Sequence, residues 1–393
     1  MPDGASVSGA ILETPALWKL AGRLISNGFW YQFHHVSGKP GKPQALSLEI
    51  THRCIARCIM CNIWKIPPQT PELAASDWLA LLSSNLFSSL IELDITGGEP
   101  FLRKDLLDLL QGICAHKRNH LPALRSIAIT TNGFLTRPIL DCIRAILPVL
   151  HHAGIDLVMV CAMDGIGPIH DAIRNFSGGW IRCDATIQGL NRLREEHPNL
   201  IVGLKTTVVP FNVDQMEAIT SYAGDNGLFT IISPCIVTPG RYLNVDRAAD
   251  LAFTPVQTQK MKTFFMTGAT RWTVHDRYLT RFLSTGVMKK PCSCGLNYLF
   301  FRSNGDLYLC PLIDGYVGNI QRDAVETMWR SPLAGRIRRK IGQYQACRSC
   351  TEPGLERYTL PYEGWTYLTQ LFKLGKREFL QMHFHMGMDK YLT

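Results

Sequence analysis

Three cysteines in the first sixth of the chain have the spacing of an iron-sulfur ligand set. Cys54, Cys58 and Cys61 form a CxxxCxxC pattern directly after a predicted strand, and Trp64 follows them. Three thiolates can hold three irons of a four-iron cluster, so the fourth iron is left without a protein ligand. An iron with an open position is a place where a small molecule can bind and react.

A zinc site is the first alternative for the same three cysteines. A structural zinc site needs four protein ligands in a closed tetrahedron. No further cysteine or histidine lies near the loop in the sequence except His52, which precedes it. Thiols that only pack in the core are the second alternative. Motifs farther along the chain favour the iron-sulfur interpretation over both.

The cysteine loop resembles the cluster loop of the radical S-adenosylmethionine superfamily. The segment Gly97-Gly98-Glu99-Pro100 resembles the GGEP motif of that superfamily. The resemblance implies that the open iron chelates the amino and carboxylate groups of S-adenosylmethionine, and that reduction releases methionine and a 5′-deoxyadenosyl radical. It also implies that Glu99 and the backbone of its loop accept hydrogen bonds from the methionine ammonium.

Residues after the later predicted strands are expected around the same cofactor. Asn132 and Asp164, each followed by a glycine, resemble further cofactor loops of the superfamily. Ala162 stands where related enzymes often have a ribose-contacting serine, and Asn212 is the substitute that we consider. Arg174 either pairs with the methionine carboxylate or is an exposed helix arginine.

A second group of cysteines lies near the C-terminal end. The segment from Cys292 to Cys310 predicts a β-hairpin with strands at 299–302 and 307–309, which brings its two end cysteines together. Two more cysteines follow as a CxxC pair, and four thiolates make a site without an open iron. The predicted ligands of this auxiliary [4Fe-4S] cluster are Cys292, Cys310, Cys347 and Cys350.

This segment resembles the twitch domain, which is the shorter form of the SPASM extension. A CxxG opening at Cys292 matches the domain, whereas the full SPASM pattern has further cysteines after Cys350 and this chain has none. Cys294 is the spare thiol, although Cys292 and Cys294 are open to exchange. A zinc ribbon is the alternative. A fully ligated cluster beside the substrate favours electron transfer, and hence a net two-electron oxidation.

Several functions therefore compete. The first is a radical enzyme that abstracts hydrogen from an unidentified substrate, with the auxiliary cluster as electron acceptor and an external donor such as flavodoxin or ferredoxin. A radical epimerase is the second, with Cys235 or Cys294 as the thiol that returns a hydrogen atom. His170 is a candidate general base. A peptide- or lipid-modifying radical enzyme and a non-catalytic iron-sulfur or zinc protein complete the set.

The elements that must position these residues alternate between short β-rich runs and helical patterns, which is typical of parallel βα units. Six units predict an α/β fold, a partial (β/α)6 TIM-like barrel, whose loops converge at the carboxyl ends of the strands. The predicted strands are 45–51, 90–96, 125–131, 155–163, 201–209 and 228–233.

The expected domain organisation has five parts. Two amphipathic segments flank three inner parts, and the chain has no repeats. The parts are an N-terminal amphipathic extension at 1–42, the radical enzyme core at 43–245, a connecting region at 246–290, the auxiliary twitch/SPASM-like domain at 291–352 and a C-terminal amphipathic tail at 353–393.

Composition indicates a globular protein of a reducing compartment. The chain has 393 residues, of which 46% are hydrophobic and 19% charged, and its 13 cysteines are clustered rather than paired. Lys19 and Arg23 interrupt the first apolar stretch, so neither a signal peptide nor a spanning helix is expected. A cytoplasmic location follows. The net charge of +9 is scattered, which predicts no nucleic-acid partner, while the amphipathic ends allow a peripheral membrane contact.

Overall fold

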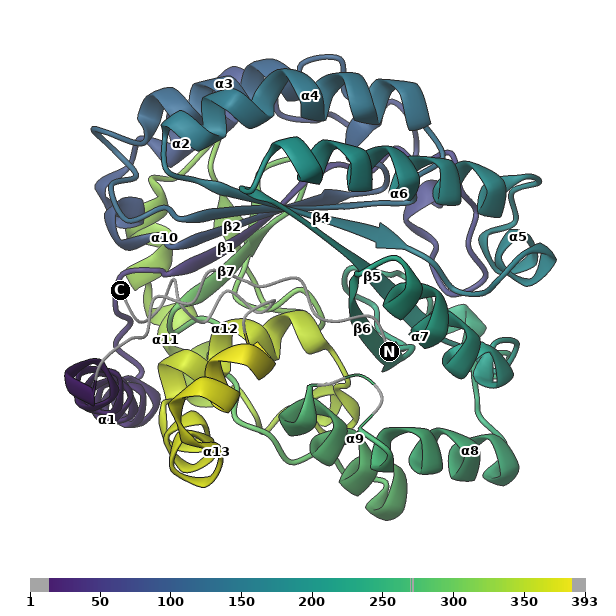
Figure 1. Cartoon of the computed structure of the whole chain (residues 1–393). Coiled ribbons are helices and arrows are strands. Elements are labelled where there is room, and N and C mark those ends of the chain that lie inside the picture. The colour runs from purple at the N-terminus through teal and green to yellow at the C-terminus, as the bar shows by residue number, and fades with distance from the viewer. Residues whose placement is uncertain (1–13, 269, 271, 384–393) are drawn as a thin grey trace.

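The computed structural model of the chain describes residues 14–268, 270 and 272–383. A single sheet organises this part, with the strand order β6-β5-β4-β3-β2-β1-β7-β8-β9 (Figure 1). The strands are β1 (Ala45–Thr51), β2 (Glu92–Gly97), β3 (Ser126–Thr131), β4 (Asp156–Ala162), β5 (Leu200–Val208), β6 (Phe229–Pro234), β7 (Tyr298–Phe301), β8 (Asp306–Tyr308) and β9 (Tyr316–Asn319).

Two layers of helices enclose the sheet. The helices that connect the parallel strands lie on its outer face, and those near the two ends of the chain lie on the other side (Figure 1). The outer layer contains α2 (Ala75–Leu82), α3 (Leu106–His116), α4 (Thr136–His152), α5 (Pro168–Arg174), α6 (Gly179–Glu196) and α7 (Met216–Asp225). The remaining helices are α1 (Thr14–Ser37), α8 (Pro255–Met266), α9 (Thr273–Thr285), α10 (Val325–Arg330), α11 (Pro332–Arg339), α12 (Pro353–Glu363) and α13 (Trp365–His383).

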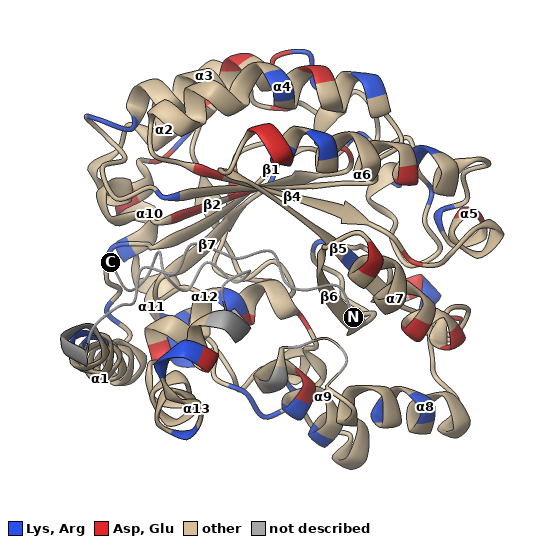
Figure 2. Ribbon diagram, in the orientation of Figure 1, with Lys and Arg blue, Asp and Glu red and all other residues tan. Residues whose placement is uncertain are grey.

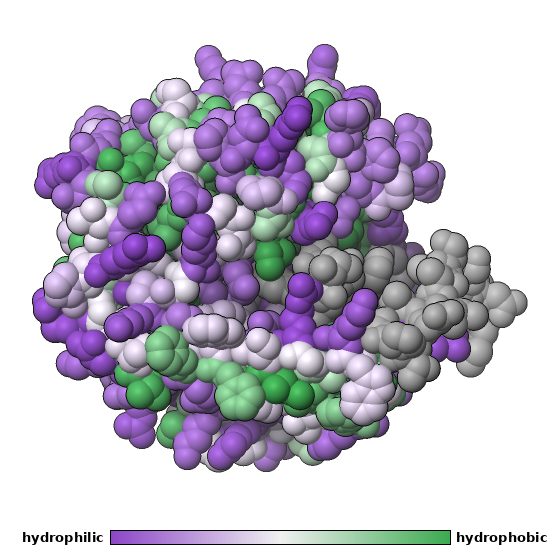
Figure 3. All heavy atoms as spheres, turned by 90° about the vertical axis from the view of Figure 1, so that its left-hand side faces the viewer, coloured by the Kyte–Doolittle hydropathy of each residue, from purple (hydrophilic) through white to green (hydrophobic). Residues whose placement is uncertain are grey.

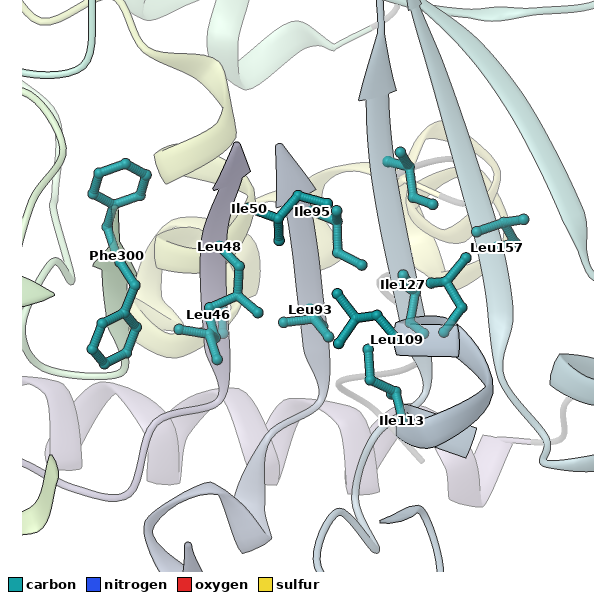
Figure 4. Close-up of a cluster of buried hydrophobic side chains, with 14 of the residues drawn as sticks. Leu46, Leu48, Ile50, Leu93, Ile95, Leu109, Ile113, Ile127, Leu157 and Phe300 are labelled. Carbon is teal, nitrogen blue, oxygen red and sulfur yellow. The ribbon is translucent and has the colours of Figure 1, made fainter. Parts of the chain in front are cut away.

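The first six strands are parallel, and cover on both faces explains their apolar sequences. All seven residues of β1 are buried. Leu93, Ile127 and Leu157 extend the same apolar layer across neighbouring strands, and Leu109 of α3 packs onto it (Figure 4). The outer faces of α3, α4 and α6 carry charges of both signs (Figure 2). The predicted partial barrel of βα units is thereby confirmed.

The cysteine-rich hairpin continues this sheet. β7 pairs parallel to β1, with Ala45 opposite Tyr298, and β8 pairs antiparallel to β7. The hairpin was expected from its turn residues, whereas its pairing with β1 was not, because two segments some 250 residues apart show no local signal of pairing. β9 was also missed, since Gly318 interrupts a run of only four residues.

Helix α12 closes the inner side of the sheet. All of its residues except Gly354 are buried, which an amphipathic tail would not predict. Arg357 donates to Glu92 of β2 at 2.9 and 2.6 Å, and the Tyr358 ring stacks on Tyr298 at 5.3 Å. Arg357 is therefore buried and paired in a segment that the sequence predicted to be an amphipathic tail. The predicted tail beyond residue 383 lies outside the described residues.

The helix near the N-terminus lies against α12 and α13. The sequence predicted an amphipathic extension at 1–42, and within it α1 runs from Thr14 to Ser37. Leu24 is buried and Ile25 is exposed, so neighbouring apolar positions point to different sides. Within residues 14–268, 270 and 272–383, no helix combines the length and the apolar character needed to cross a membrane.

Candidate functional site

One cavity at the carboxyl ends of the parallel strands collects most of the predicted cofactor residues. Its wall contains all three cysteines of the first cluster motif together with residues from five strand ends. The predicted residues on this wall are Cys54, Cys58, Cys61, Gly97, Gly98, Asn132, Arg174 and Cys235. The convergence expected of a βα barrel thus brings together residues that are up to 181 positions apart.

The cysteine loop is held by the end of α5. Arg57 N donates to Arg174 O at 3.1 Å, and Ile59 N donates to Ile173 O at 2.9 Å. Within the loop, Cys61 N donates to Cys58 O at 3.2 Å. These backbone bonds fix the loop that carries the three thiols, although residues 54–61 contain no helix or strand.

The electrostatics of the three thiols fit a ligand set that needs a cation. Burial, and then the neighbouring Cys58 sulfur, raises the pKa of Cys54 to about 12, and the same causes raise that of Cys61 to about 12. Burial also raises the pKa of Cys58, although Arg174 opposes the shift. Bound iron supplies the positive charge that keeps such thiols ionised.

Cluster ligands differ in arrangement from the ligands of a single ion. Within the part of the chain that the structure describes, no three His, Cys, Asp or Glu side chains meet closely enough to hold one metal ion. The cysteines of a four-iron cluster bind different irons, so they need not meet at one point. His52, the candidate fourth zinc ligand, lies with Nδ1 2.8 Å from Glu72.

The glycine loop after β2 passes very close to the cysteine loop. A Cβ atom on Gly98 would lie 2.2 Å from Arg53 O and 2.7 Å from His52 O, and one on Gly97 would lie 2.4 Å from Thr51 O. These contacts are to backbone atoms, which cannot rotate away. Glycine at both positions therefore allows the loop to approach the cysteines and to present backbone to the cavity.

Glu99 and Pro100 do not line the cavity. The Glu99 carboxylate accepts hydrogen bonds from Asn132 N at 2.8 Å, Thr131 Oγ1 at 2.8 Å and Phe101 N at 3.2 Å. Burial raises the pKa of Glu99 to about 7 despite these donors. In this structure Glu99 orders the loops after β2 and β3.

The residues after β4 and β5 that the sequence predicted to contact the cofactor form a buried network. Arg174 Nη2 lies 2.6 Å from Asp164 Oδ2, and Arg174 Nη1 lies 3.6 Å from Cys58 Sγ. The arginine is thus buried and paired rather than exposed. Asn212 donates to Asp164 O at 2.7 Å and accepts from Val209 N at 2.7 Å, so its amide is occupied within the protein. Neither Asp164 nor Asn212 lines the cavity.

Two further predicted residues lie apart from the cavity. His170 accepts a hydrogen bond from Asp164 N at 3.1 Å, and burial, followed by the charge of Arg174, lowers its pKa to about 3. That position supports the Asp164 loop rather than a proton transfer. Cys294 is buried beside the auxiliary cysteines and does not line the cavity.

Asn132 supplies an unused donor in the cavity wall. Its Oδ1 accepts from Phe134 N at 2.9 Å, whereas its buried Nδ2 has no hydrogen-bond partner among the described residues. Buried polar groups are normally satisfied, so an unpaired amide in a cavity wall suits a bound ligand.

Four polar residues of the cavity were missed by sequence reasoning. Lys205 Nζ lies 3.4 Å from Glu352 Oε1, and Tyr242 Oη donates to Glu352 Oε2 at 3.3 Å. Arg241 donates to the Thr96 hydroxyl. Lys205 and Glu352 belong to β5 and to the segment before α12, and no motif links them in the sequence. A lysine within a strand that begins with an apolar run, Leu200 to Leu204, was the one available signal.

The auxiliary cysteines meet in a second pocket. Cys292, Cys310, Cys347 and Cys350 all line it, and Cys294 does not. Burial raises the pKa of Cys350 to about 12, although Lys290 opposes the shift.

The two sites are joined by a short segment. Cys350 of the second pocket is two residues before Glu352, which lines the first cavity. Thr351 lies between them, and its hydroxyl donates to Pro234 O at 2.8 Å. The end of β6 therefore fixes the distance between the two cysteine sites.

Comparison with known families and structures agrees with this architecture. The family described as the radical SAM superfamily matches residues 48–223, and the SPASM iron-sulfur cluster-binding domain matches residues 292–351. SuiB of Streptococcus suis, solved with S-adenosylmethionine, has a TM-score of 0.56 at 14% identity, and the match covers 88% of this chain and 78% of the SuiB chain. Native anSMEcpe with S-adenosylmethionine and the Cp18Cys peptide has a TM-score of 0.53 at 14% identity, and the match covers 88% of this chain and 99% of the anSMEcpe chain.

The matches to curated relatives cover smaller shares of the chains. The sporulation killing factor maturation protein SkfB of Bacillus subtilis is 22% identical over 74% of this chain and 66% of its own length. The PqqA peptide cyclase of Rhodopseudomonas palustris is 29% identical over 35% of this chain and 34% of its own. The matched region thus spans less than two thirds of either relative.

Proposed function

This chain belongs to the radical S-adenosylmethionine superfamily and carries a SPASM iron-sulfur domain, and from that premise we propose that it oxidises its substrate by two electrons. When bound, the first cluster and S-adenosylmethionine would supply a 5′-deoxyadenosyl radical that removes a hydrogen atom; the auxiliary cluster would accept the second electron, and the accompanying proton would pass to solvent. The observation that carries the proposal is the Cys350–Glu352 segment, which runs from the second pocket into the first cavity.

The residues of the first cavity divide between cofactor and substrate. Cys54, Cys58 and Cys61 would hold three irons, while Arg174 beside Cys58 favours the thiolate form. Asn132 would donate its unpaired Nδ2 to the nucleotide or to the methionine group. These roles follow from the position of each donor in the cavity wall.

Lys205, Arg241, Tyr242 and Glu352 would form the substrate side of the cavity. Two cations and one carboxylate line the same cavity as the cysteine loop, although they lie far from that loop in the sequence. They suit a substrate that has both hydrogen-bond donors and an anionic group. Glu352 of this cavity is two residues after Cys350 of the second pocket, so a substrate bound there would lie near the electron acceptor.

A peptide is the substrate class that the relatives favour. The PqqA peptide cyclase is named for a peptide that it cyclises, and SkfB is named for the maturation of the sporulation killing factor. A hydrogen-transfer experiment tests this class. Extracts of fully deuterated producing cells are separated into peptide, small-molecule and lipid fractions and incubated with the reconstituted enzyme. Deuterium in 5′-deoxyadenosine from the peptide fraction supports a peptide substrate, and deuterium from another fraction alone contradicts it.

Epimerisation is the second candidate, because a thiol lines the reaction cavity. Cys235 follows β6, and its Sγ lies 3.9 Å from Leu251 O. Such a thiol can return a hydrogen atom to a substrate radical. Turnover in deuterium oxide decides between the two reactions, since epimerisation places solvent deuterium on product carbon and oxidation does not.

The two clusters and the cleavage of S-adenosylmethionine, on which the oxidation depends, are tested with cysteine variants after anaerobic reconstitution. We expect about eight irons per chain and dithionite-dependent 5′-deoxyadenosine in the native protein. Replacement of Cys54, Cys58 and Cys61 by alanine should remove about half of the iron and all cleavage. A protein that contains only zinc, or that never cleaves S-adenosylmethionine, would contradict the proposal.

A further inference from the structure

Helix α1 has two different apolar faces. The inner face packs on the helices near the C-terminal end: Leu20 and Leu24 are buried in a cluster with Leu360 and Tyr367. Asn27 Nδ2 also donates to Pro361 O at 3.0 Å. The inner face therefore fixes how α1 lies on the molecule and leaves the other face turned outward.

The outer face of α1 is apolar and exposed. Large apolar side chains stand on it at positions 18, 25, 29, 33 and 36, and these separations of seven, four, four and three residues place them in one stripe. A band of green and pale residues crosses the lower part of the side where α1 lies (Figure 3). The exposed fractions are 66% for Trp18, 37% for Ile25, 65% for Phe29, 56% for Trp30, 51% for Phe33 and 77% for Val36.

The stripe is unusual for a surface that faces only water. Single exposed apolar residues are normal, but a contiguous apolar patch marks a binding surface. Phe29 contacts α13 edge to face, with its ring centroid 5.5 Å from that of Trp365, whereas the inner packing rests on Leu20, Leu24 and Gly28. The large exposed fractions of the stripe residues, among the residues that the structure describes, therefore suit a binding surface.

Charge identifies the chemistry of that occupant. Helix α1 contains Lys19 and Arg23 and no aspartate or glutamate, and no acidic residue marks it in Figure 2. Arg339 of the neighbouring α11 lies over Gly38 at the end of α1, and Arg336 and Lys340 are exposed nearby in the sequence. An apolar, aromatic stripe with cationic edges matches the interface of an anionic bilayer, where rings lie at headgroup depth.

We propose that α1 docks the enzyme on an anionic membrane surface, with the stripe from Trp18 to Val36 inserted into the headgroup region. The 24-residue helix then lies in the plane of the interface. A protein surface is a poorer match, because protein surfaces mix charges of both signs. This docking is independent of the proposed oxidation, since none of the stripe residues lines the reaction cavity.

Vesicle flotation of the full chain tests the proposal. Vesicles of phosphatidylcholine and phosphatidylglycerol at three to one are compared with pure phosphatidylcholine. We expect binding to the anionic vesicles and weaker binding at high salt, because salt screens the lysine and arginine charges. Joint replacement of Trp18, Phe33 and Val36 by serine should weaken binding at least about tenfold.

A matched variant controls for the loss of exposed apolar groups. Ile181, Phe211 and Val256 are exposed by 68%, 69% and 67% and lie outside α1, and their joint replacement by serine should leave vesicle binding unchanged. Lys19→Glu provides a second variant that keeps the stripe and should reduce binding only to anionic vesicles. The proposal is overturned if anionic vesicles do not bind, if both triple variants behave alike, or if the stripe variant instead dissociates an oligomer. Cleavage of S-adenosylmethionine, measured in parallel, should not differ between the variants.

Discussion

Replacement of Gly98 by alanine is the sharpest single perturbation of the proposed cofactor site. The added Cβ atom would lie 2.2 Å from Arg53 O, 2.6 Å from the Arg53 carbonyl carbon and 2.7 Å from His52 O. A relaxed carbon contact needs about 3.5 Å, so the glycine loop and the cysteine loop must separate by about 1 Å. Cys54 is the next residue and moves with this backbone.

The displacement has a calculable effect. A misplacement of about 1 Å at reacting groups costs about 10²-fold in rate, and overpacking costs about 1–3 kcal/mol of stability. We therefore expect Gly98→Ala to remain folded at room temperature and to lose about 10²-fold in 5′-deoxyadenosine formation. Chromatographic measurement of 5′-deoxyadenosine after dithionite reduction gives the rate, and thermal unfolding gives the stability.

Gly224 on α7 provides the matched control. A Cβ atom there would meet no other atom within 4 Å, and the residue has an ordinary helical backbone. Gly224→Ala should therefore keep the native rate of cleavage. Equal rates for Gly98→Ala and the native protein would refute the reasoning from close approach, because the loop would then be free to relax.

Three further predictions concern the rest of the molecule. Replacement of Cys347 and Cys350 by serine should leave dithionite-driven cleavage of S-adenosylmethionine intact but block formation of the oxidised product. Mass spectrometry of the reaction mixture measures the amount of that product. Burial raises the pKa of Asp276 from 3.8 to about 6, so its ionisation destabilises the fold as the pH rises through that window. The free energy of unfolding can be measured with urea. As the pH rises from about 4 to about 6.5, its value for Asp276→Asn should increase by about 3 kcal/mol relative to that of the native protein. Arg357→Met leaves Glu92 buried without this partner and should cost about 3–5 kcal/mol, and Glu92→Met in the same chain should recover much of the loss.

The parallel strands were predictable because each is a short run rich in β-forming residues between turn signals. Their observed ends agree with the expected ones within two residues: the strand expected at 90–96 is Glu92–Gly97. The radical S-adenosylmethionine resemblance was equally accessible and is confirmed, since the cysteine and glycine motifs are local in sequence. Local chemistry and local periodicity were sufficient for both.

Long-range partners explain what the sequence did not reveal. Arg357 looks like a surface residue until Glu92 is placed beside it across 265 positions. Lys205 and Glu352 are far apart in the sequence and lie close together in the fold, where Glu352 directly precedes α12. The role expected of Glu99 depended on motif resemblance alone, and the structure shows its oxygens occupied by the neighbouring loops.

Electron paramagnetic resonance of the reduced protein tests most directly whether an iron in the Cys54–Cys61 loop is open to the nucleotide. The spectrum of the anaerobically reconstituted native protein is recorded with and without S-adenosylmethionine, and the Cys54→Ala, Cys58→Ala, Cys61→Ala triple variant isolates the contribution of the auxiliary site. We predict that S-adenosylmethionine shifts a signal present only in the native protein. An unchanged native spectrum would contradict the three-thiolate site.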